Sequence, residues 1–445
     1  MNRFTERLLA GGMSAAEVES KGRLFERALR SLPCDFQGAG TLLSYFVPGR
    51  IEVLGKHTDY AGGRSLLCTV EKGFCLVVRP RQDAQVRVIN ARSQASCSLS
   101  LNPEMPAAGP HWASYPGTVV RRLARNFPAA RRGADIAFIS DLPAAAGMSS
   151  SSAFIVAIFL ALADVNDLAE SAAYRREIHS PEDLAGFLGT VENGEGFGTL
   201  EGDRGVGTFG GSEDHTAILC SRPGELRQYS FCPIRHERTV AFPDGWVIVV
   251  GVSGVIARKT GAARVKYNRA ALAARKVLEL WRAASGRSDP TLAAAASHAP
   301  DAPDRIRAVL LAAADPDFPK ALLFDRFQQF LDESTTIVPG ATDALATGDL
   351  ACFGELVDRS QRGAETKLGN QVPETIALAV SARRLGAAAA SAFGAGFGGS
   401  VWALVPAEEA ADFKVRWAAA YQAQFPARRR CRFLITRPSP AALRL

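Results

Sequence analysis

Short apolar runs, bounded by glycine, proline and polar residues, dominate the first third of the chain. Residues 1–30, where charged and apolar positions alternate irregularly, are expected to form an opening helix. Runs rich in β-branched and aromatic residues between turn residues are typical of strands. Such runs lie at residues 44–55, 74–78, 86–90, 96–101 and 134–139. The pattern therefore predicts a strand-rich N-terminal region.

After residue 143 the pattern favours longer helices. Residues 154–160 are apolar on every face, which predicts a buried helix. Residues 246–250 form a continuous apolar run, which is typical of a fully buried strand. Residues 186–211, rich in glycine and charge, are predicted to form a long irregular insertion. Further helices are predicted at residues 262–284, in segments up to about residue 347 and at 374–385, with a strand at 401–405.

Mixed strands and helices fall into two blocks, which favours an α+β or α/β protein with two lobes. The chain has 445 residues, more than one hydrophobic core ordinarily serves, so two or three domains are expected. The pattern changes between residues 226 and 245, and we place the domains at residues 1–235 and 236–445.

Composition and charge narrow the class of protein. Hydrophobic residues make up 47% of the chain and charged residues 22%, as in ordinary globular proteins. The 52 basic residues, mostly arginine, exceed the 45 acidic ones and give a net charge of +7. A basic excess is compatible with nucleic acid, an anionic membrane surface or small anionic substrates as partners. No basic stripe with interleaved aromatic residues is present, which argues against nucleic acid.

Neither a membrane span nor a metal framework is indicated. No apolar run reaches the roughly 20 residues that a membrane helix needs, and the first residues lack the apolar segment of a secretory signal. The 8 cysteines are scattered without a CxxC pair, so neither a disulfide framework nor a structural zinc site is expected. We therefore expect a cytoplasmic protein that acts without a membrane.

The segment LPAAAGMSSSS at residues 142–152 lies between a predicted strand and the buried helix. Small residues allow a ligand close to the backbone, and a helix start offers unpaired N–H groups with a positive dipole end. The segment lacks the GxxxxGK[ST] spacing of a Walker A loop. It is a candidate phosphate site, although a serine cap on a core helix explains the same residues.

Two further segments carry candidate chemistry. Residues 48–63 read PGRIEVLGKHTDYAGG and crowd Arg, Lys, His and Asp into a loop after a strand. Residues 393–400 read FGAGFGGS and form a glycine-rich loop. Glycines suit a loop that closes on a ligand, whereas charged loop residues are more often simply solvated.

These three segments, in this order, resemble the three motifs of the GHMP small-molecule kinases, and of the galactokinase family in particular. Residues 48–63 resemble the galactokinase signature, residues 142–152 the ATP loop and residues 393–400 the C-terminal glycine motif. The resemblance implies an α+β fold with an N-terminal mixed-sheet lobe, a C-terminal ferredoxin-like lobe and an active site in the cleft between them. It also implies transfer of the γ-phosphate of ATP to the anomeric hydroxyl of galactose or a related sugar, which gives a sugar 1-phosphate.

The resemblance assigns roles to the matching residues. Arg50 and Asp214, the latter in the segment GSEDH at residues 211–215, match the groups that flank the reacting hydroxyl. Asp214 would accept the hydroxyl proton, while Arg50 would lower its pKa and stabilise the developing charge. The residues expected to contact the sugar are Lys56, His57, Asp59, Gly211 and Arg264. The residues expected to bind ATP are Ala145, Ala146, Gly147, Met148, Ser149, Ser150 and Ser151.

Mg²⁺ is implied as the companion of ATP. The matching ligands are Ser151, the last serine of the family's triplet, and Glu192. A hydroxyl and a carboxylate, completed by phosphates and water, are ligands that suit Mg²⁺. The segment between Glu192 and Asp214 is longer than in the family, so Glu195 and Glu201 are alternative ligands.

Several positions depart from the family pattern. Lys56 stands where the signature carries a Glu that contacts a sugar hydroxyl, and a cation there would be compatible with the carboxylate of a uronic acid. If Lys56 instead turns its ammonium to solvent, it has no such role. A family Tyr that contacts the sugar falls near Arg264 by ungapped counting, or at Tyr267 with a small insertion. Glu213 and His215 replace Met and Gln on either side of Asp214, with opposite expected effects on its pKa.

Two functions from different classes follow. The first is a sugar kinase of the galactokinase family that uses ATP and Mg²⁺, acts on galactose or a related sugar, and is a monomer or homodimer. The second is a galactokinase-like protein that binds sugar and ATP as a sensor with little catalysis. Retention of Arg50 and Asp214 favours the enzyme, and ADP release over a panel of sugars discriminates the two.

Overall fold

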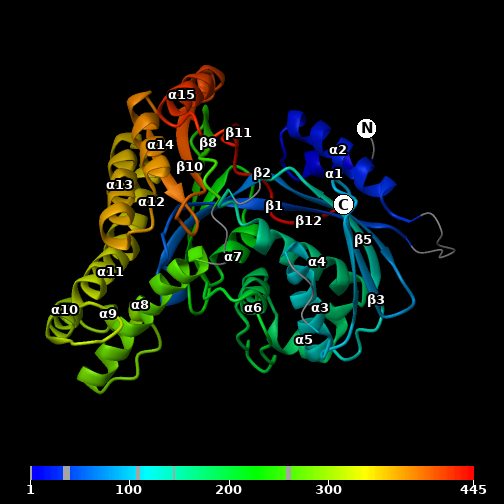
Figure 1. The fold of residues 1–445 in the computed structure, drawn as a ribbon, viewed down its shortest axis with the longest axis horizontal. Helices are drawn as coiled ribbons and strands as arrows, with labels where there is room; N and C mark the ends of the chain where they lie inside the picture. Colours follow the sequence, from blue (N-terminus) through cyan, green and yellow to red (C-terminus); the bar gives the residue numbers. More distant parts are fainter. Residues whose placement is uncertain (1–2, 34–40, 107–110, 144–145, 257–261) are drawn as a thin grey trace.

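The structure is a computed structural model that describes residues 3–33, 41–106, 111–143, 146–256 and 262–445. It has two lobes and a helical arm (Figure 1). The predicted opening helix is two helices, α1 (Arg3–Ala10) and α2 (Ala15–Arg30), separated by a turn at Gly11 and Gly12. Within the described ranges, no helix is both long and apolar enough to cross a bilayer.

The N-terminal lobe is built on an eight-stranded mixed sheet in the order β12-β1-β2-β5-β3-β4, with β6 joined to β2 and β7 to β6. All its pairings are antiparallel except that of β3 with β5. Its strands are β1 (Leu43–Leu54), β2 (Arg64–Pro80), β3 (Gln85–Asn90), β4 (Ser96–Ser100), β5 (Ala134–Ser140), β6 (Glu225–Ser230), β7 (Arg235–Ala241) and β12 (Leu443–Arg444). The strands predicted in this region are confirmed.

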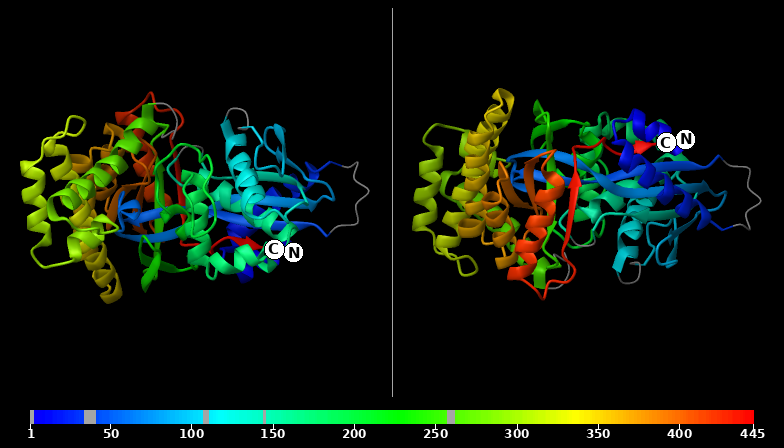
Figure 2. Two further views of the ribbon diagram at one scale, coloured as in Figure 1. Left: turned by 90° about the horizontal axis from the view of Figure 1, so that it is seen from below. Right: turned by 90° about the horizontal axis from the view of Figure 1, so that it is seen from above.

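Helices cover both faces of this sheet (Figures 1 and 2). Alternate residues of a strand point to opposite faces, so Tyr45 and Val47 pack with α3, α4 and α6, while Phe46 packs with α1 and α2. Helix α4 is apolar all round and almost wholly buried, as its sequence predicts. The helices of this lobe after α2 are α3 (Ser114–Asn126), α4 (Ser150–Val165), α5 (Ala172–Glu177), α6 (Pro181–Asn193) and α7 (Glu213–Cys220).

The C-terminal lobe contains a four-stranded antiparallel sheet in the order β11-β8-β10-β9. The strands β8 (Trp246–Val252), β9 (Ala389–Phe393), β10 (Ser400–Pro406) and β11 (Arg432–Thr436) therefore lie in the spatial order four, one, three, two. This arrangement is the predicted ferredoxin-like lobe. Helices α14 (Pro373–Arg384) and α15 (Ala410–Gln424) pack on one face, while α12 (Val338–Thr347) and α13 (Leu350–Gly363) share a core with the other face and with β1 and β2.

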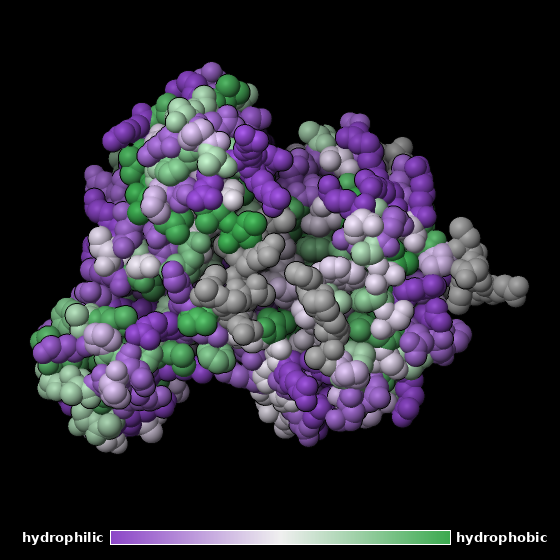
Figure 3. All heavy atoms as spheres, in the orientation of Figure 1, coloured by the Kyte–Doolittle hydropathy of each residue, from purple (hydrophilic) through white to green (hydrophobic). Residues whose placement is uncertain are grey.

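A helical arm extends from this lobe and reaches the loop that follows β1. It consists of α8 (Ala262–Ser285), α9 (Leu292–Ser297), α10 (Ala302–Ala312) and α11 (Lys320–Asp332), whose apolar faces form one core with Ala61. A π-helical turn at Glu333–Ile337 joins α11 to α12, and a second follows α13 at Ala364–Leu368. Figure 3 shows hydrophilic side chains over much of the visible face, with apolar side chains scattered among them on the arm.

The boundary between the lobes differs from the one predicted from the sequence, because two segments assigned to the second domain belong to the first sheet. Strand β7 begins at Arg235 but pairs with β6 in the first sheet, so the second sheet starts only at Trp246. The chain also returns to the first lobe at its C-terminal end, where β12 pairs with β1. A division at residues 235 and 236 therefore cuts the first sheet, because strand partners that lie far apart in sequence leave no local signal.

The predicted irregular insertion is also shorter than expected. Helix α6 runs to Asn193 and ends at Gly194, whose positive φ of 95° is a left-handed helix cap that favours glycine. The excursion therefore covers residues 194–212, and the helix before it has the regular apolar face that buries Leu184, Phe187 and Leu188.

Candidate active site

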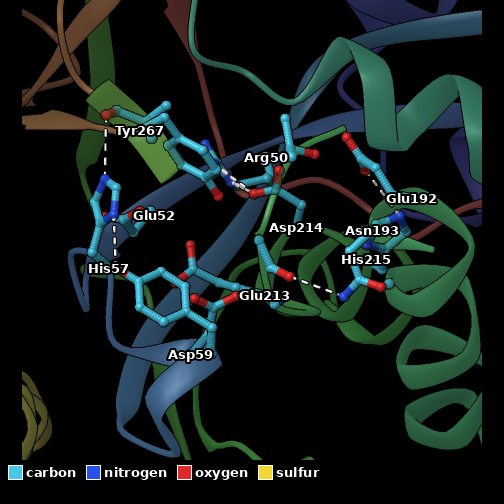
Figure 4. Close-up of a pocket in the computed structure, with 17 residues that line it drawn as sticks. Arg50, Glu52, His57, Asp59, Glu192, Asn193, Glu213, Asp214, His215 and Tyr267 are labelled. Carbon is cyan, nitrogen blue, oxygen red and sulfur yellow. Dashed lines mark hydrogen bonds and ion pairs between the residues drawn. The ribbon is translucent and has the colours of Figure 1, made fainter. Parts of the chain in front are cut away.

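The signature loop (residues 55–63), the segment around Asp214 and the glycine loop (residues 394–399) meet in one pocket between the lobes (Figure 4). Its walls come from β1, the signature loop, α6, the start of α7, α8 and the glycine loop. The lining residues are Arg50, Glu52, His57, Asp59, Tyr60, Gly189, Glu192, Asn193, Thr208, Gly210, Gly211, Glu213, Asp214, His215, Tyr267, Gly394 and Ala395. Among the described residues of this lining, one arginine faces five carboxyl groups, so the pocket is acidic although the chain is basic.

Arg50, which is buried, and Asp214, which is partly buried, form an ion pair in this pocket. Arg50 Nε and Nη2 lie 2.7 and 2.6 Å from Asp214 Oδ1. Asp214 is the second residue of α7, so its carboxylate lies at the positive end of the helix dipole. Arg50 Nη1 also donates to the Gly147 carbonyl at 2.6 Å. One guanidinium therefore joins the carboxylate to the loop before α4.

The charge state of this pair is fixed by its neighbours. Burial alone would lower the pKa of Arg50, but the carboxylates of Asp214, Glu213 and Glu52 raise it above its ordinary value. Arg50 is therefore cationic throughout the working pH range. A guanidinium this close favours the ionised form of Asp214, which is the form that can accept a proton.

A second polar group lies beside the pair, at the start of α4. Ser152 Oγ donates to Glu192 Oε2 at 2.6 Å and lies 3.2 Å from Asp214 Oδ2. His215 Nε2 is 3.4 Å from the same Glu192 oxygen. Ser152 is fully buried, whereas Ser151 is half-buried. The structure thus brings Ser152, one residue beyond the predicted Ser151, to Glu192.

Glu192 lies near Asp214 despite the long segment between them. Val206 N donates to the Glu192 carbonyl at 2.8 Å, and Asp203 N donates to the Gly194 carbonyl at 3.2 Å. The excursion after α6 therefore leaves and returns at the same point, so its length does not displace Glu192. The alternative Glu195 is exposed and bonds Arg275, and the alternative Glu201 is exposed as well.

The loop before α4, the phosphate loop (described here from Ala146 to Ser149), is held by two neighbours. Gly147 and Ser149 have positive φ angles of 75° and 54°, which turn the backbone sharply into the helix. Ser400 Oγ donates to the Ala146 carbonyl at 2.6 Å. A Cβ at Gly394 would lie 2.8 Å from the Gly147 carbonyl, so the glycine loop packs backbone to backbone against the phosphate loop. The predicted ATP residue Ala145 lies outside the described residues.

His57 is fixed by a relay that crosses from the helical arm to the glycine loop. Arg326 Nη2 donates to Tyr60 Oη at 3.1 Å, and Tyr60 Oη is 3.0 Å from His57 Nδ1. His57 Nε2 lies 3.2 Å from the Ala395 carbonyl, which can only accept. Nε2 therefore carries the proton and Nδ1 accepts from Tyr60. Arg326 also donates to the His57 carbonyl at 2.5 Å. Helix α11 therefore fixes the position of the His57 backbone directly and that of its ring through Tyr60.

Lys56 does not line the pocket, contrary to the predicted sugar contact. Its side chain is 1% exposed, and its Nζ donates to Ser360 Oγ at 2.9 Å. Ser360 Oγ in turn donates to Glu333 Oε1 at 2.9 Å, and that oxygen also accepts from Gly55 N at 2.8 Å. Lys56 turns neither to solvent nor to the sugar: it belongs to a buried network that attaches the signature loop to the C-terminal lobe.

The aromatic position near α8 is filled by Tyr267. Its ring lies 5.3 Å from the His57 ring, and burial raises the pKa of its hydroxyl well above the ordinary value. Tyr267, the position that the gapped count gives, therefore lines the pocket. The side chain of Arg264, the alternative in the ungapped count, lies outside the described residues.

Asp59 and Gly211 meet at the entrance of α7. Glu213 N donates to Asp59 Oδ2 at 3.2 Å. A Cβ at Gly211 would lie 2.4 Å from the same oxygen, so only glycine fits beside this carboxylate. Of the predicted sugar contacts, His57, Asp59 and Gly211 thus line the pocket together.

Sequence reasoning missed several residues of the site. Glu52 follows Arg50 by two positions, and strand alternation alone could have placed both on one face. Arg326 and Glu333 carry no local signal, because they reach the signature loop from helices more than two hundred residues away.

Comparison with known proteins agrees with this geometry. Three family models match: the galactokinase galactose-binding signature at residues 35–80, the GHMP kinases N terminal domain at 114–193 and the GHMP kinases C terminal domain at 341–423. A galactokinase of Roseiflexus sp. (strain RS-1) is 28% identical over 382 residues, which cover 84% of this chain and 86% of that protein. One of Chloroflexus aggregans (strain MD-66 / DSM 9485) is 27% identical over 381 residues, with the same coverage of 84% and 86%.

Solved structures support the fold. Lactococcus lactis galactokinase complexed with galactose aligns with a TM-score of 0.76 at 20% identity and covers 95% of this chain and 99% of its own. Methanococcus jannaschii mevalonate kinase aligns with a TM-score of 0.55 at 12% identity, covering 91% and 99%. The chain has the fold of the GHMP small-molecule kinases and matches both of their domain models. Its galactose-binding signature and its relatives make it similar to the galactokinases, a family of sugar kinases.

Proposed function

We propose that this protein transfers the γ-phosphate of ATP to the anomeric hydroxyl of galactose or a related neutral sugar, giving a sugar 1-phosphate. The observation that carries the proposal is the Arg50–Asp214 pair, which joins the pocket to the phosphate loop. Phosphoryl transfer requires positioning and charge neutralisation more than covalent chemistry. A partly buried base beside a helix start suited to anions meets both requirements.

Each of these residues has its own role in the reaction. Asp214 takes the proton from the sugar hydroxyl while the oxygen of that hydroxyl bonds to the γ-phosphorus. The bond from this phosphorus to the β–γ bridging oxygen breaks, and ADP is released. Arg50 keeps Asp214 ionised beforehand and neutralises charge as it develops. The N–H groups of the first turn of α4, behind Gly147 and Ser149, bind the phosphates. His57, Asp59, Gly211 and Tyr267 orient the sugar.

Mg²⁺ fits beside Glu192. Ser152 Oγ and Glu192 Oε2, 2.6 Å apart, are hard oxygen ligands next to the phosphate loop. Within the described ranges, no cluster of three or more His, Cys, Asp or Glu side chains could hold a metal by itself. A bound Mg²⁺ would neutralise phosphate charge, and nucleotide phosphates and water would complete its ligands. Ser151, half-buried at the preceding position, is the alternative hydroxyl.

We expect Glu192→Gln to raise the Mg²⁺ concentration for half-maximal activity by at least about tenfold, because a neutral amide is a weaker ligand than a carboxylate. Ser152→Ala and Ser151→Ala, measured in the same titration at fixed ATP, identify the hydroxyl ligand. Only the alanine variant at the ligating serine should share the Glu192→Gln shift. An unchanged Mg²⁺ dependence in Glu192→Gln would remove Glu192 from the metal site.

The charge of the pocket supports a neutral sugar over an acidic one. A uronic acid requires that the Lys56 ammonium face the sugar, but Lys56 Nζ donates to Ser360 Oγ instead. Carboxyl groups of Asp59, Glu213 and Asp214 line the sugar side, and a substrate carboxylate there would be repelled. Sugar hydroxyls, which donate hydrogen bonds, suit such acceptors.

Lys56→Glu is accordingly expected to destabilise the protein without changing its choice of sugar. The new carboxylate would lie against Ser360 and near Glu333, at a cost of about 3–5 kcal/mol for an uncompensated buried charge. Thermal unfolding should show the loss, while the ratio of ADP release with galactose to that with galacturonate should stay within about twofold. Lys56→Gln, which keeps a donor to Ser360, serves as the milder control. A ratio shifted tenfold or more toward galactose would return Lys56 to the sugar site.

An ADP-release screen over neutral hexoses, pentoses, uronic acids and phosphosugars tests the proposal. We expect ATP turnover with galactose or another neutral hexose. The alternative, a sugar and ATP sensor, predicts saturable binding of both ligands with no turnover on any sugar.

A further inference from the structure

Two acidic residues of the pocket, Glu52 and Glu213, flank the Arg50–Asp214 pair. Glu52 follows Arg50 by two residues on β1, so both side chains leave the same face of the strand. Glu213 directly precedes Asp214 at the start of α7. Glu52 is 3% exposed and Glu213 is 5% exposed. Each member of the ion pair thus has a buried carboxyl group as a near neighbour.

The surroundings of these two side chains favour a proton between them. Glu213 Oε2 accepts from Ser65 Oγ at 2.7 Å. Glu52 Oε1 is buried, and no donor reaches it within the part of the chain that the structure describes. The Glu52 carboxyl group instead faces that of Glu213, within reach of a hydrogen bond between them. Two carboxyl groups can form such a bond only when one of them is protonated.

The surroundings favour retention of that proton. Burial raises the pKa of Glu52 to about 7, and burial followed by the charge of Glu52 raises the pKa of Glu213 well above its ordinary value. The groups that face the two acids and favour their ionised forms are Arg50 and Lys56, and those that oppose ionisation are Asp59, Asp214 and Glu333. Tyr60 also faces Glu52, but burial raises its pKa to about 12, so it stays neutral.

We propose that Glu52 and Glu213 share one proton at neutral pH, and that this proton positions Asp214 and limits the negative charge around Arg50. The inference rests on the proposed kinase reaction in the same pocket. When the proton leaves, the two adjacent carboxylates repel, and their repulsion acts on the first turn of α7, which carries both Glu213 and Asp214. The second charge also competes with the phosphate for Arg50. Glu52 and Glu213 are therefore positioning residues, and activity falls as the pH rises.

The variant Glu52→Gln keeps a hydrogen bond to Glu213 but removes the titratable proton between the two side chains. The amide donates to Glu213 without titrating, so the contact and the single negative charge persist at every pH. We expect kcat/KM of the wild-type chain to fall by at least about tenfold between neutral pH and about pH 9, and that of Glu52→Gln to fall much less. Glu71→Gln is the matched control, since Glu71 is a buried acid on β2 that accepts from Ser14 N away from the pocket. It should keep the wild-type pH profile.

Infrared difference spectroscopy on the ligand-free chain tests the shared proton itself. The wild-type chain and Glu71→Gln should show the C=O stretch of a buried protonated carboxyl group at neutral pH, and Glu52→Gln should lack it. A band that persists in Glu52→Gln, or that is missing from the wild type at neutral pH, would overturn the inference. Equal alkaline losses of kcat/KM in wild type and Glu52→Gln would overturn the positioning role.

The two tests also distinguish this inference from the proposed function. If no sugar supports ADP release, the kinase proposal fails on its own screen. The infrared measurement still decides whether Glu52 and Glu213 hold a proton, because it needs neither substrate nor turnover.

Discussion

Replacement of Asp214 by Asn is expected to lower kcat by about 10²–10⁴-fold, the usual contribution of a general base, while sugar binding survives. The amide has the shape of the carboxylate and can still accept from Arg50 through its oxygen, but it cannot take the hydroxyl proton. The effect should appear in kcat measured by ADP release. The sugar dissociation constant, measured by titration calorimetry, should change much less.

The control for Asp214→Asn is Asp358→Asn. Asp358 forms an ion pair with Arg383 in the C-terminal lobe, 3.0 Å apart and away from the pocket. Asp358→Asn therefore removes an Asp–Arg ion pair without removing a proposed catalytic group. It should retain wild-type kcat. Turnover by Asp214→Asn within about twofold of the wild type would eliminate Asp214 as the base.

Arg50→Lys should lower kcat by about 10²–10³-fold, comparable to the loss of a transition-state hydrogen-bond donor. The lysine keeps the charge but presents a single ammonium, which cannot reach both Asp214 Oδ1 and the Gly147 carbonyl as the guanidinium does. The base and the phosphate loop therefore lose their common link. Steady-state kinetics give kcat, and KM for ATP should rise as the phosphate loop loses its contact.

A stability measurement separates this effect from misfolding. Arg50 is 4% exposed, so its replacement also lowers the free energy of unfolding, which thermal melts will report. Arg383→Lys makes the same change in a partly exposed pair and should keep kcat. If a folded Arg50→Lys protein turns over at the wild-type rate, Arg50 does not contribute to the transition state.

The local sequence pattern predicted those elements around the site whose structure depends on one stretch of the chain alone. Strand alternation and turn residues located β1, β2 and β5, and the apolar run after the serines located α4. The resemblance to the galactokinase motifs placed Arg50, His57, Asp59 and Asp214 in one pocket. The same resemblance assigned the glycine at 211 to that pocket.

Contacts between distant segments could not be predicted in the same way. The direction of Lys56 depends on Ser360 and Glu333, which come from helices of the other lobe. The choice between Ser151 and Ser152 depends on the rotation of α4 about its axis, and four consecutive serines give no pattern that fixes it. The lobe boundary failed for a similar reason, since β12 returns from the end of the chain to pair with β1.

The basic charge of the chain also proved a poor guide to the pocket. Of Arg50, Lys56 and Arg264, the cations expected near the nucleotide and sugar, only Arg50 is among the described lining residues. Carboxyl groups outnumber cations in the pocket lining, so the net charge of the chain does not indicate the electrostatic field inside the pocket. That field depends on which side chains the fold brings together.

Phosphorus NMR of the reaction mixture, with ATP, Mg²⁺ and galactose, tests the central claim most directly. Formation of a sugar 1-phosphate in step with ADP, abolished by Asp214→Asn, is the result predicted here. Galactose and ATP that bind saturably while no phosphosugar forms, with galactose or with any other sugar of the panel, would contradict the account and leave a binding protein in its place.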